Sequence, residues 1–223
     1  MKKIYMLILS ACLTMAFTGC GKANNNVQAP DSPGSAAPVT DDFILNNDTV
    51  IYKDESGPPE IIITDAGNEQ VLAGIEDYPS KPEINTSGEQ LAYITPFEFE
   101  MIGEVMLYDA KTREQTKVIT QDLIGENQSV NHIKWLDDRY LLVTTGYAYG
   151  TVHSSRQLYA YDQEDQTFEL VHKLADQESI KEIHITNNEV MLDLIQYTDD
   201  QFNEYTEGQQ ALDKASLYEQ LKK

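Results

Sequence analysis

The sequence predicts an all-β fold of repeated antiparallel sheets, followed by a C-terminal helix. From about Ile44 onward, apolar and polar residues alternate with period two in short runs separated by turn residues, which is the pattern of half-buried strands. The pattern recurs, because equivalent strands begin at Val50, Leu91, Leu141 and Val190, which lie 41, 50 and 49 residues apart. A period of about 40–50 residues with four strands per unit is typical of propeller blades. We therefore expect about four propeller-like units.

The expected strands differ in clarity from unit to unit. In the second unit, which is the clearest, they cover 82–85, 91–94, 105–109 and 116–119. In the third unit they cover 132–135, 140–143, 157–162 and 167–171. The first unit is looser, with strands over 48–52, 60–65 and 70–72, and the fourth shows only 183–185 and 190–195. After 198 the character changes, because 209–222 places Ala211, Leu212, Ala215, Tyr218 and Leu221 at the three-to-four spacing of an amphipathic helix.

Two of these units resemble the TolB-type propeller repeat, a relative of the WD-repeat family. The likeness lies in the turn and strand 85–93, in the strand end Leu107-Tyr108-Asp109 and, more weakly, in 135–140; it covers about 44–195. The Ser-Pro-Asp-Gly turn of that family is not intact here, and four units are fewer than the family usually has. The resemblance therefore implies propeller-like sheets and leaves ring closure open. The alternatives are an open stack of small sheets and a β-sandwich.

The N-terminus has the three parts of an export signal. Lys2 and Lys3 supply positive charge, and Ile4 to Phe17 is an apolar run too short to span a bilayer as a helix. Thr18-Gly19-Cys20 then resembles the bacterial lipobox, with Phe17 in place of the common Leu. The resemblance implies a signal peptide over 1–19 and lipid chains, such as palmitate, on Cys20. The alternatives are an uncleaved anchor and a secretory peptide in which this cysteine is incidental.

The segment after Cys20 is predicted to be a flexible tether over 20–42, and the β-repeat domain with its helix to cover 43–223. The tether is rich in Asn, Pro, Gly, Ser and Ala and has no apolar periodicity, so it cannot form a core. The other cysteine, Cys12, lies within the signal, which leaves no pair for a disulfide in the domain.

Composition and motifs exclude several classes of function. With 37 acidic and 16 basic residues, the chain has a formal net charge of −21, which opposes binding to nucleic acid. The sequence contains no Gly-x-Ser-x-Gly elbow and no phosphate-binding glycine loop, and its four histidines are not at metal-ligand spacing. We therefore expect a protein that is not an enzyme, with no cofactor and no metal.

Aromatic residues in two equivalent loops are the candidate binding residues. Phe97 and Phe99 lie between two strands of the second unit, and Tyr147, Tyr149 and His153 lie at the same place in the third. Both loops should leave the same edge of adjacent sheets, where exposed aromatic side chains commonly serve recognition. The alternative is that these aromatics extend the strands and pack inward.

The sequence thus favours a lipid-anchored, non-catalytic protein on the extracytoplasmic side of the cell membrane. Its partners would be the membrane, through Cys20, and an envelope protein, a peptide or a glycan. One alternative is a carboxylate-dependent hydrolase of cell-wall glycan, with two acids facing each other across a cleft. The other is a solute-binding or sensory lipoprotein with a deep, closed pocket.

Overall fold

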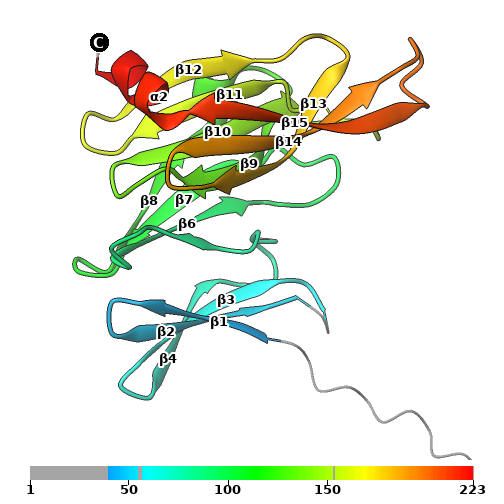
Figure 1. Ribbon diagram of the computed structural model, residues 1–223. Coiled ribbons are helices and arrows are strands. Elements are labelled where there is room, and N and C mark those ends of the chain that lie inside the picture. The colour runs from blue at the N-terminus through cyan, green and yellow to red at the C-terminus, as the bar shows by residue number, and fades with distance from the viewer. Residues whose placement is uncertain (1–39, 55–56, 153, 223) are drawn as a thin grey trace, which may run out of the picture. The chain divides into compact units, whose positions relative to one another are not determined.

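The computed structural model describes residues 40–54, 57–152 and 154–222 (Figure 1). These residues fall within one unit of the chain, 37–223. The predicted signal peptide, Cys20, most of the predicted tether and His153 lie outside the described residues.

Four antiparallel sheets follow one another along the chain, and in each sheet the strands are ordered as in the sequence. The first sheet contains β1 (Thr40–Leu45), β2 (Asp48–Lys53), β3 (Glu60–Asp65) and β4 (Asn68–Ala73). The second contains β5 (Glu83–Ile84), β6 (Gln90–Thr95), β7 (Glu104–Asp109) and β8 (Glu114–Ile119). The third contains β9 (Gln128–Trp135), β10 (Tyr140–Tyr147), β11 (Gln157–Asp162) and β12 (Thr167–Lys173). The fourth contains β13 (Glu178–Ile185), β14 (Glu189–Tyr197) and β15 (Tyr205–Asp213). Two short helices, α1 (Gln121–Ile124) and α2 (Lys214–Leu221), complete the described part, and neither is long and apolar enough to cross a membrane.

The hydrophobic core lies in three layers, each between two successive sheets. Leu45 and Ile61 of the first sheet pack with Tyr93 of the second, and Ile94 of the second packs with Leu141 of the third. Leu142 of the third sheet packs with Leu192 of the fourth. No such cluster among the described residues joins the fourth sheet to the first. The predicted all-β, propeller-like fold with four units is confirmed, and the described sheets form an open series.

Strands β7 and β11 both end in Tyr-Asp, and the structure gives the aspartate a physical role. Asp109 Oδ1 accepts backbone N–H bonds from Lys111 (2.9 Å) and Thr112 (2.8 Å). Asp162 Oδ1 likewise accepts the N–H groups two and three residues later, at 3.0 and 3.3 Å, and its carboxylate also binds Arg139. Burial alone would raise the pKa of both carboxyls, but these hydrogen bonds outweigh burial and lower it. Each aspartate therefore fixes the turn that leads into the last strand of its sheet.

The sequence missed the strands at the two ends of the domain. Strand β1 begins at Thr40, three residues before the predicted start of the domain, and pairs with β2 over its whole length. Strand β15 was not predicted, because its residues 209–213 were assigned to the C-terminal helix. In the structure these residues pair with β14, which satisfies the backbone groups of β14 that would otherwise lie at a sheet edge.

The C-terminal helix exists but is shorter than predicted. It begins after Asp213, whose side chain accepts the backbone N–H of Ser216 at 2.8 Å and caps the first turn. Leu217 is buried in the core between the third and fourth sheets, and the Tyr218 hydroxyl donates to Asp137 Oδ2 at 2.7 Å. The helix thus extends this core.

Because β10 is buried on both faces, we predict that shortening one of its side chains strongly lowers the free energy of unfolding. Leu142 is fully buried, so Leu142→Ala should lower the free energy of unfolding by about 2–5 kcal/mol through lost burial and a residual cavity. Leu170→Ala, at an exposed position of β12, should change it by about 0.5 kcal/mol or less. Urea unfolding followed by the fluorescence of Trp135, the single tryptophan, measures both. Equal effects of the two substitutions would contradict the layered core.

Candidate functional site

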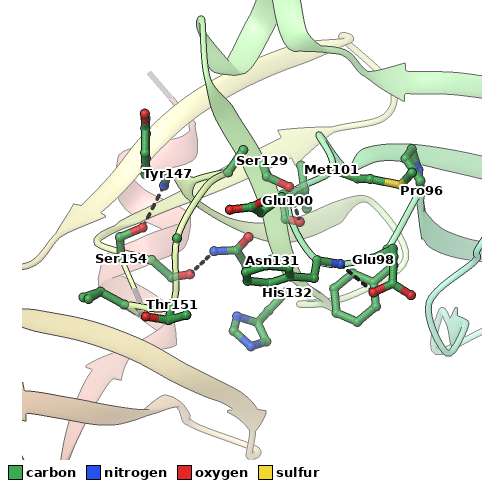
Figure 2. Close-up of a pocket in the computed structure, with 17 residues that line it drawn as sticks. Pro96, Glu98, Glu100, Met101, Ser129, Asn131, His132, Tyr147, Thr151 and Ser154 are labelled. Atoms are coloured by element: carbon green, nitrogen blue, oxygen red, sulfur yellow. Dashed lines mark hydrogen bonds between the residues drawn. The ribbon is translucent and has the colours of Figure 1, made fainter. Parts of the chain in front are cut away.

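A pocket of about 400 Å³ lies where two equivalent loops meet (Figure 2). One loop, 96–103, joins β6 to β7 in the second sheet, and the other, 148–156, joins β10 to β11 in the third. The first residues of β9 lie between the loops and contribute Ser129, Asn131 and His132 to the lining. The pocket is therefore formed between the second and third sheets, where they pack side by side.

The structure brings most of the predicted aromatic residues together. Phe97, Phe99 and Tyr147 line the pocket and are 48%, 61% and 54% exposed, so they do not pack inward. Tyr149 is not in the lining, but its ring meets that of Tyr147 edge-on, with the centroids 5.5 Å apart. The role of these side chains as binding contacts stays a prediction, as does that of His153, which is outside the described residues.

Backbone hydrogen bonds hold the first loop in place. The N–H of Phe97 donates to the carbonyl of Tyr78 at 2.6 Å, and the N–H of Phe99 donates to Glu98 Oε1 at 2.8 Å. At the end of the loop, the N–H of Gly103 donates to Ser129 Oγ at 2.9 Å, and the Gly103 carbonyl accepts the N–H of Val130. The backbone of the first loop is therefore tied to neighbouring segments at Phe97 and Gly103.

The second loop is held just as closely. The N–H of Tyr147 donates to Ser154 Oγ at 2.8 Å, and the N–H of Ala148 donates to the Asn127 carbonyl at 2.9 Å. Gly146 allows this turn, because a Cβ there would lie 2.8 Å from Asn131 Nδ2 and 2.9 Å from the Ser154 carbonyl. The chain can pass only where no side chain is present.

Beneath the aromatic rim, which consists of Phe97, Phe99 and Tyr147, the pocket has a polar floor of Asn131, His132 and Ser155. The sequence did not indicate this floor. In β9, Val130 pairs with Thr145 and His132 with Thr144, so Asn131 is the extra residue of a β-bulge. Its side-chain amide donates to Ser155 Oγ, and the Ser155 N–H donates to Ser179 Oγ at 3.0 Å. His132 Nδ1 lies 3.0 Å from Thr144 Oγ1. Nothing in the sequence around Asn131 distinguishes a bulge from a regular strand, which is why these residues were missed.

The charges around the pocket are unevenly distributed. Glu98 and Glu100 are in its lining, and no Lys or Arg is found among the described lining residues. Tyr147 also borders a second hollow of about 280 Å³, whose charged lining residues are Arg156, Lys173 and Asp176. An acidic aromatic pocket and a more basic hollow therefore share Tyr147 as their common wall.

The potential metal ligands of the described chain lie elsewhere. Glu182, His184 and Asp193 form the group of side chains that could hold an ion, and all three belong to the fourth sheet. The pocket itself offers hydroxyl, amide and carboxylate groups for hydrogen bonding, together with aromatic faces for stacking. It is suited to binding a partly polar ligand.

The chain belongs to the family described as Domain of unknown function (DUF4652), whose model matches residues 97–213. This span contains the second pocket loop, the first loop except for Pro96, and all strands from β7 to β15. A comparison with curated proteins finds no match. The family assignment therefore brings no activity with it.

Solved structures with the same kind of fold show low sequence identity. A candidate conserved lipoprotein from Clostridium novyi NT has a TM-score of 0.56 at 18% identity, over 60% of this chain and 86% of that one. An oligogalacturonate lyase in complex with manganese has a TM-score of 0.53 at 14% identity, over 79% of this chain and 50% of the lyase. A prolyl endopeptidase has a TM-score of 0.52 at 13% identity, over 78% of this chain and 26% of the endopeptidase.

These likenesses establish the fold alone. TolB from Acinetobacter baumannii is also matched, but its TM-score of 0.40 adds nothing to the argument. The propeller-like arrangement that the resemblance to TolB-type repeats implied is supported by the four successive antiparallel sheets themselves. This chain spans only half of the lyase and about a quarter of the endopeptidase, so their activities are not carried over.

We predict that the close approach at Gly146 is essential to the pocket. Gly146→Ala would force the Cβ against Asn131 and the Ser154 backbone, so it should lower the free energy of unfolding by about 1–3 kcal/mol. Gly57→Ala is the control, because a Cβ there meets nothing within 4 Å. Urea unfolding measures both, and an unchanged midpoint for Gly146→Ala would contradict the proposed packing of the second loop.

Proposed function

We propose that this DUF4652-family chain is a non-catalytic, lipid-anchored protein of the cell envelope that binds a cationic segment of a peptide or protein. The anchor would be Cys20, and the described domain would face the extracytoplasmic side. The lipobox-like sequence before Cys20 supports the anchor, and the fold shared with a candidate lipoprotein is consistent with it. The aromatic pocket would be the binding site.

One observation carries the choice of ligand. Exposed aromatic rings and two glutamates line the same pocket, and the described lining contains no Lys or Arg. A Lys or Arg side chain fits such a site, because its charge is attracted both to carboxylates and to the faces of aromatic rings. The net charge of −21 would also draw a cationic partner towards the domain.

The second hollow beside Tyr147 indicates which group should flank the cationic side chain of the ligand. Lys173 has no ion pair among the described residues, and Arg156 pairs with the highly exposed Asp176 at 3.1 Å. An acidic group of the same ligand, next to its cationic side chain, would meet these two residues. A peptide of mixed charge therefore fits better than a purely basic one.

The site gives the two alternative functions less support. A glycoside hydrolase needs carboxyl groups on both sides of the scissile bond, whereas Glu98 and Glu100 come from a single loop. A solute-binding protein encloses its ligand, whereas the aromatic lining here is about half exposed. Recognition of a partner at the surface accounts for both features.

Charge-neutral variants test the ligand class. Binding of a fluorescein-labelled peptide of alternating Arg, Glu and Gly should weaken about tenfold in Glu98→Gln/Glu100→Gln, because the carboxylate attraction is lost. The control Glu69→Gln/Glu114→Gln removes the same charge at exposed positions on β4 and β8, away from the pocket, and should bind as the native chain does. Fluorescence anisotropy measures all three affinities, and equal losses in both double variants would mean that only net charge matters.

The anchor has an equally direct test. Cys20→Ser should release the chain from the membrane fraction and abolish the mass added by lipid, because the thiol is the acceptor. Cys12→Ser, within the apolar run of the signal, should leave both unchanged. Fractionation and mass spectrometry of the expressed full chain would show this, and retention of the Cys20→Ser chain on membranes would refute lipid anchoring at this residue.

A further inference from the structure

Strand geometry places three metal-ligating side chains on one face of the fourth sheet. Glu182 and His184 are two residues apart in β13, so their side chains point the same way. Asp193 of β14 is the direct cross-strand partner of Glu182. Its neighbours Leu192 and Leu194 pack into the core, so Asp193 points to the opposite, outer face. The three groups thus meet on the face that no other described sheet covers.

The distances between these groups are those of a ligand cluster. His184 Nε2 lies 2.9 Å from Asp193 Oδ2 and 3.6 Å from Glu182 Oε2, and one ligand atom from each residue lies within 4.8 Å of the others. Ligand atoms placed tetrahedrally at about 2.0–2.2 Å from a zinc ion are about 3.3–3.6 Å apart. Small rotations of partly exposed side chains would bring the three atoms to that spacing.

The cluster contains more acceptors than donors. A ring nitrogen carries at most one proton, yet two carboxylates converge on Nε2 of His184. Asp193 Oδ1 accepts a hydrogen bond from Gln209 Nε2, and Asp193 Oδ2 faces His184 Nε2. Lys181, the extra residue of a bulge in β13, is paired with Glu207 at 2.6 Å. A divalent cation would satisfy both carboxylates and the imidazole at once.

We propose that Glu182, His184 and Asp193 bind a divalent transition-metal ion of the zinc class. One imidazole nitrogen with two carboxylate oxygens suits such an ion, whereas calcium and magnesium favour sites built from oxygen alone. Gln209 Nε2, 2.8 Å from Asp193 Oδ1, holds the second oxygen of that carboxylate and so orients the first towards the cluster. Water would fill the remaining coordination positions, since the site is open to solvent. None of these residues lines the aromatic pocket, so the proposal does not depend on the pocket's function.

Isothermal titration of zinc chloride into the full chain, purified without a histidine tag, tests the site. The expected result is one ion per chain, with affinity reduced at least a hundredfold in His184→Gln and in Asp193→Asn. Gln209→Ala should bind about tenfold more weakly, because it leaves the three ligands but removes their support. His172→Gln is the matched control, because His172 Nε2 of the third sheet lies 3.3 Å from Gln210 Oε1 of the fourth and pairs with no carboxylate among the described residues, so this variant should bind as the native chain does.

Thermal unfolding separates loss of the site from loss of the fold. The metal-free variants should melt as metal-free native protein does. Zinc should raise the melting temperature of the native chain and of His172→Gln, raise that of Gln209→Ala less, and leave those of His184→Gln and Asp193→Asn unchanged. Magnesium at the same concentration should change none of them. The proposal is overturned if zinc produces no binding heat, if His184→Gln binds it as tightly as the native chain, or if His172→Gln loses binding equally.

Discussion

The structure depends on burying both faces of its inner sheets. In β10, Leu141 faces the second sheet and Leu142 faces the fourth, and both are fully buried. A strand with two buried faces reads as a continuous apolar run and is stable only with a neighbouring sheet on each side. The third sheet therefore requires the second and the fourth, and the second likewise requires the first. Each unit is thus marginal alone, and the series is the cooperative element.

The two ends of this series are finished differently. The outer face of the first sheet carries a cross-strand row of Ile51, Ile62 and Val71. The outer face of the fourth carries the pair of Lys181 with Glu207 and the cluster around His184. Polar end faces are how repeat proteins remain soluble. The fourth sheet meets that requirement with charged groups, which is also why ligand-forming side chains gather there.

The sequence predicted the features that arise from local periodicity. Alternation and recurrence identified most strands, and the equivalent positions of the two aromatic loops correctly placed Phe97, Phe99 and Tyr147 on the same edge. Features decided by pairing were missed. Ala211 and Leu212 fit a helical spacing as well as a strand, and only the need of β14 for a partner decides between them. The bulge at Asn131 and the opposition of Glu182 and Asp193 likewise depend on register, which no single strand encodes.

The exposed aromatic rim has an energetic cost that the fold could have avoided. Leaving about half of Phe97 and of Phe99 in water forgoes on the order of 1 kcal/mol for each ring. Hydrogen bonds to Tyr78 and Ser129 tie the backbone of this loop to its surroundings near both ends. Single exposed apolar residues need no explanation, but a group of them around a polar floor is typical of an interaction surface. The rigid backbone beneath the rings would reduce the entropy lost on binding. The rim is therefore better understood as a preorganised contact surface than as an imperfectly packed core.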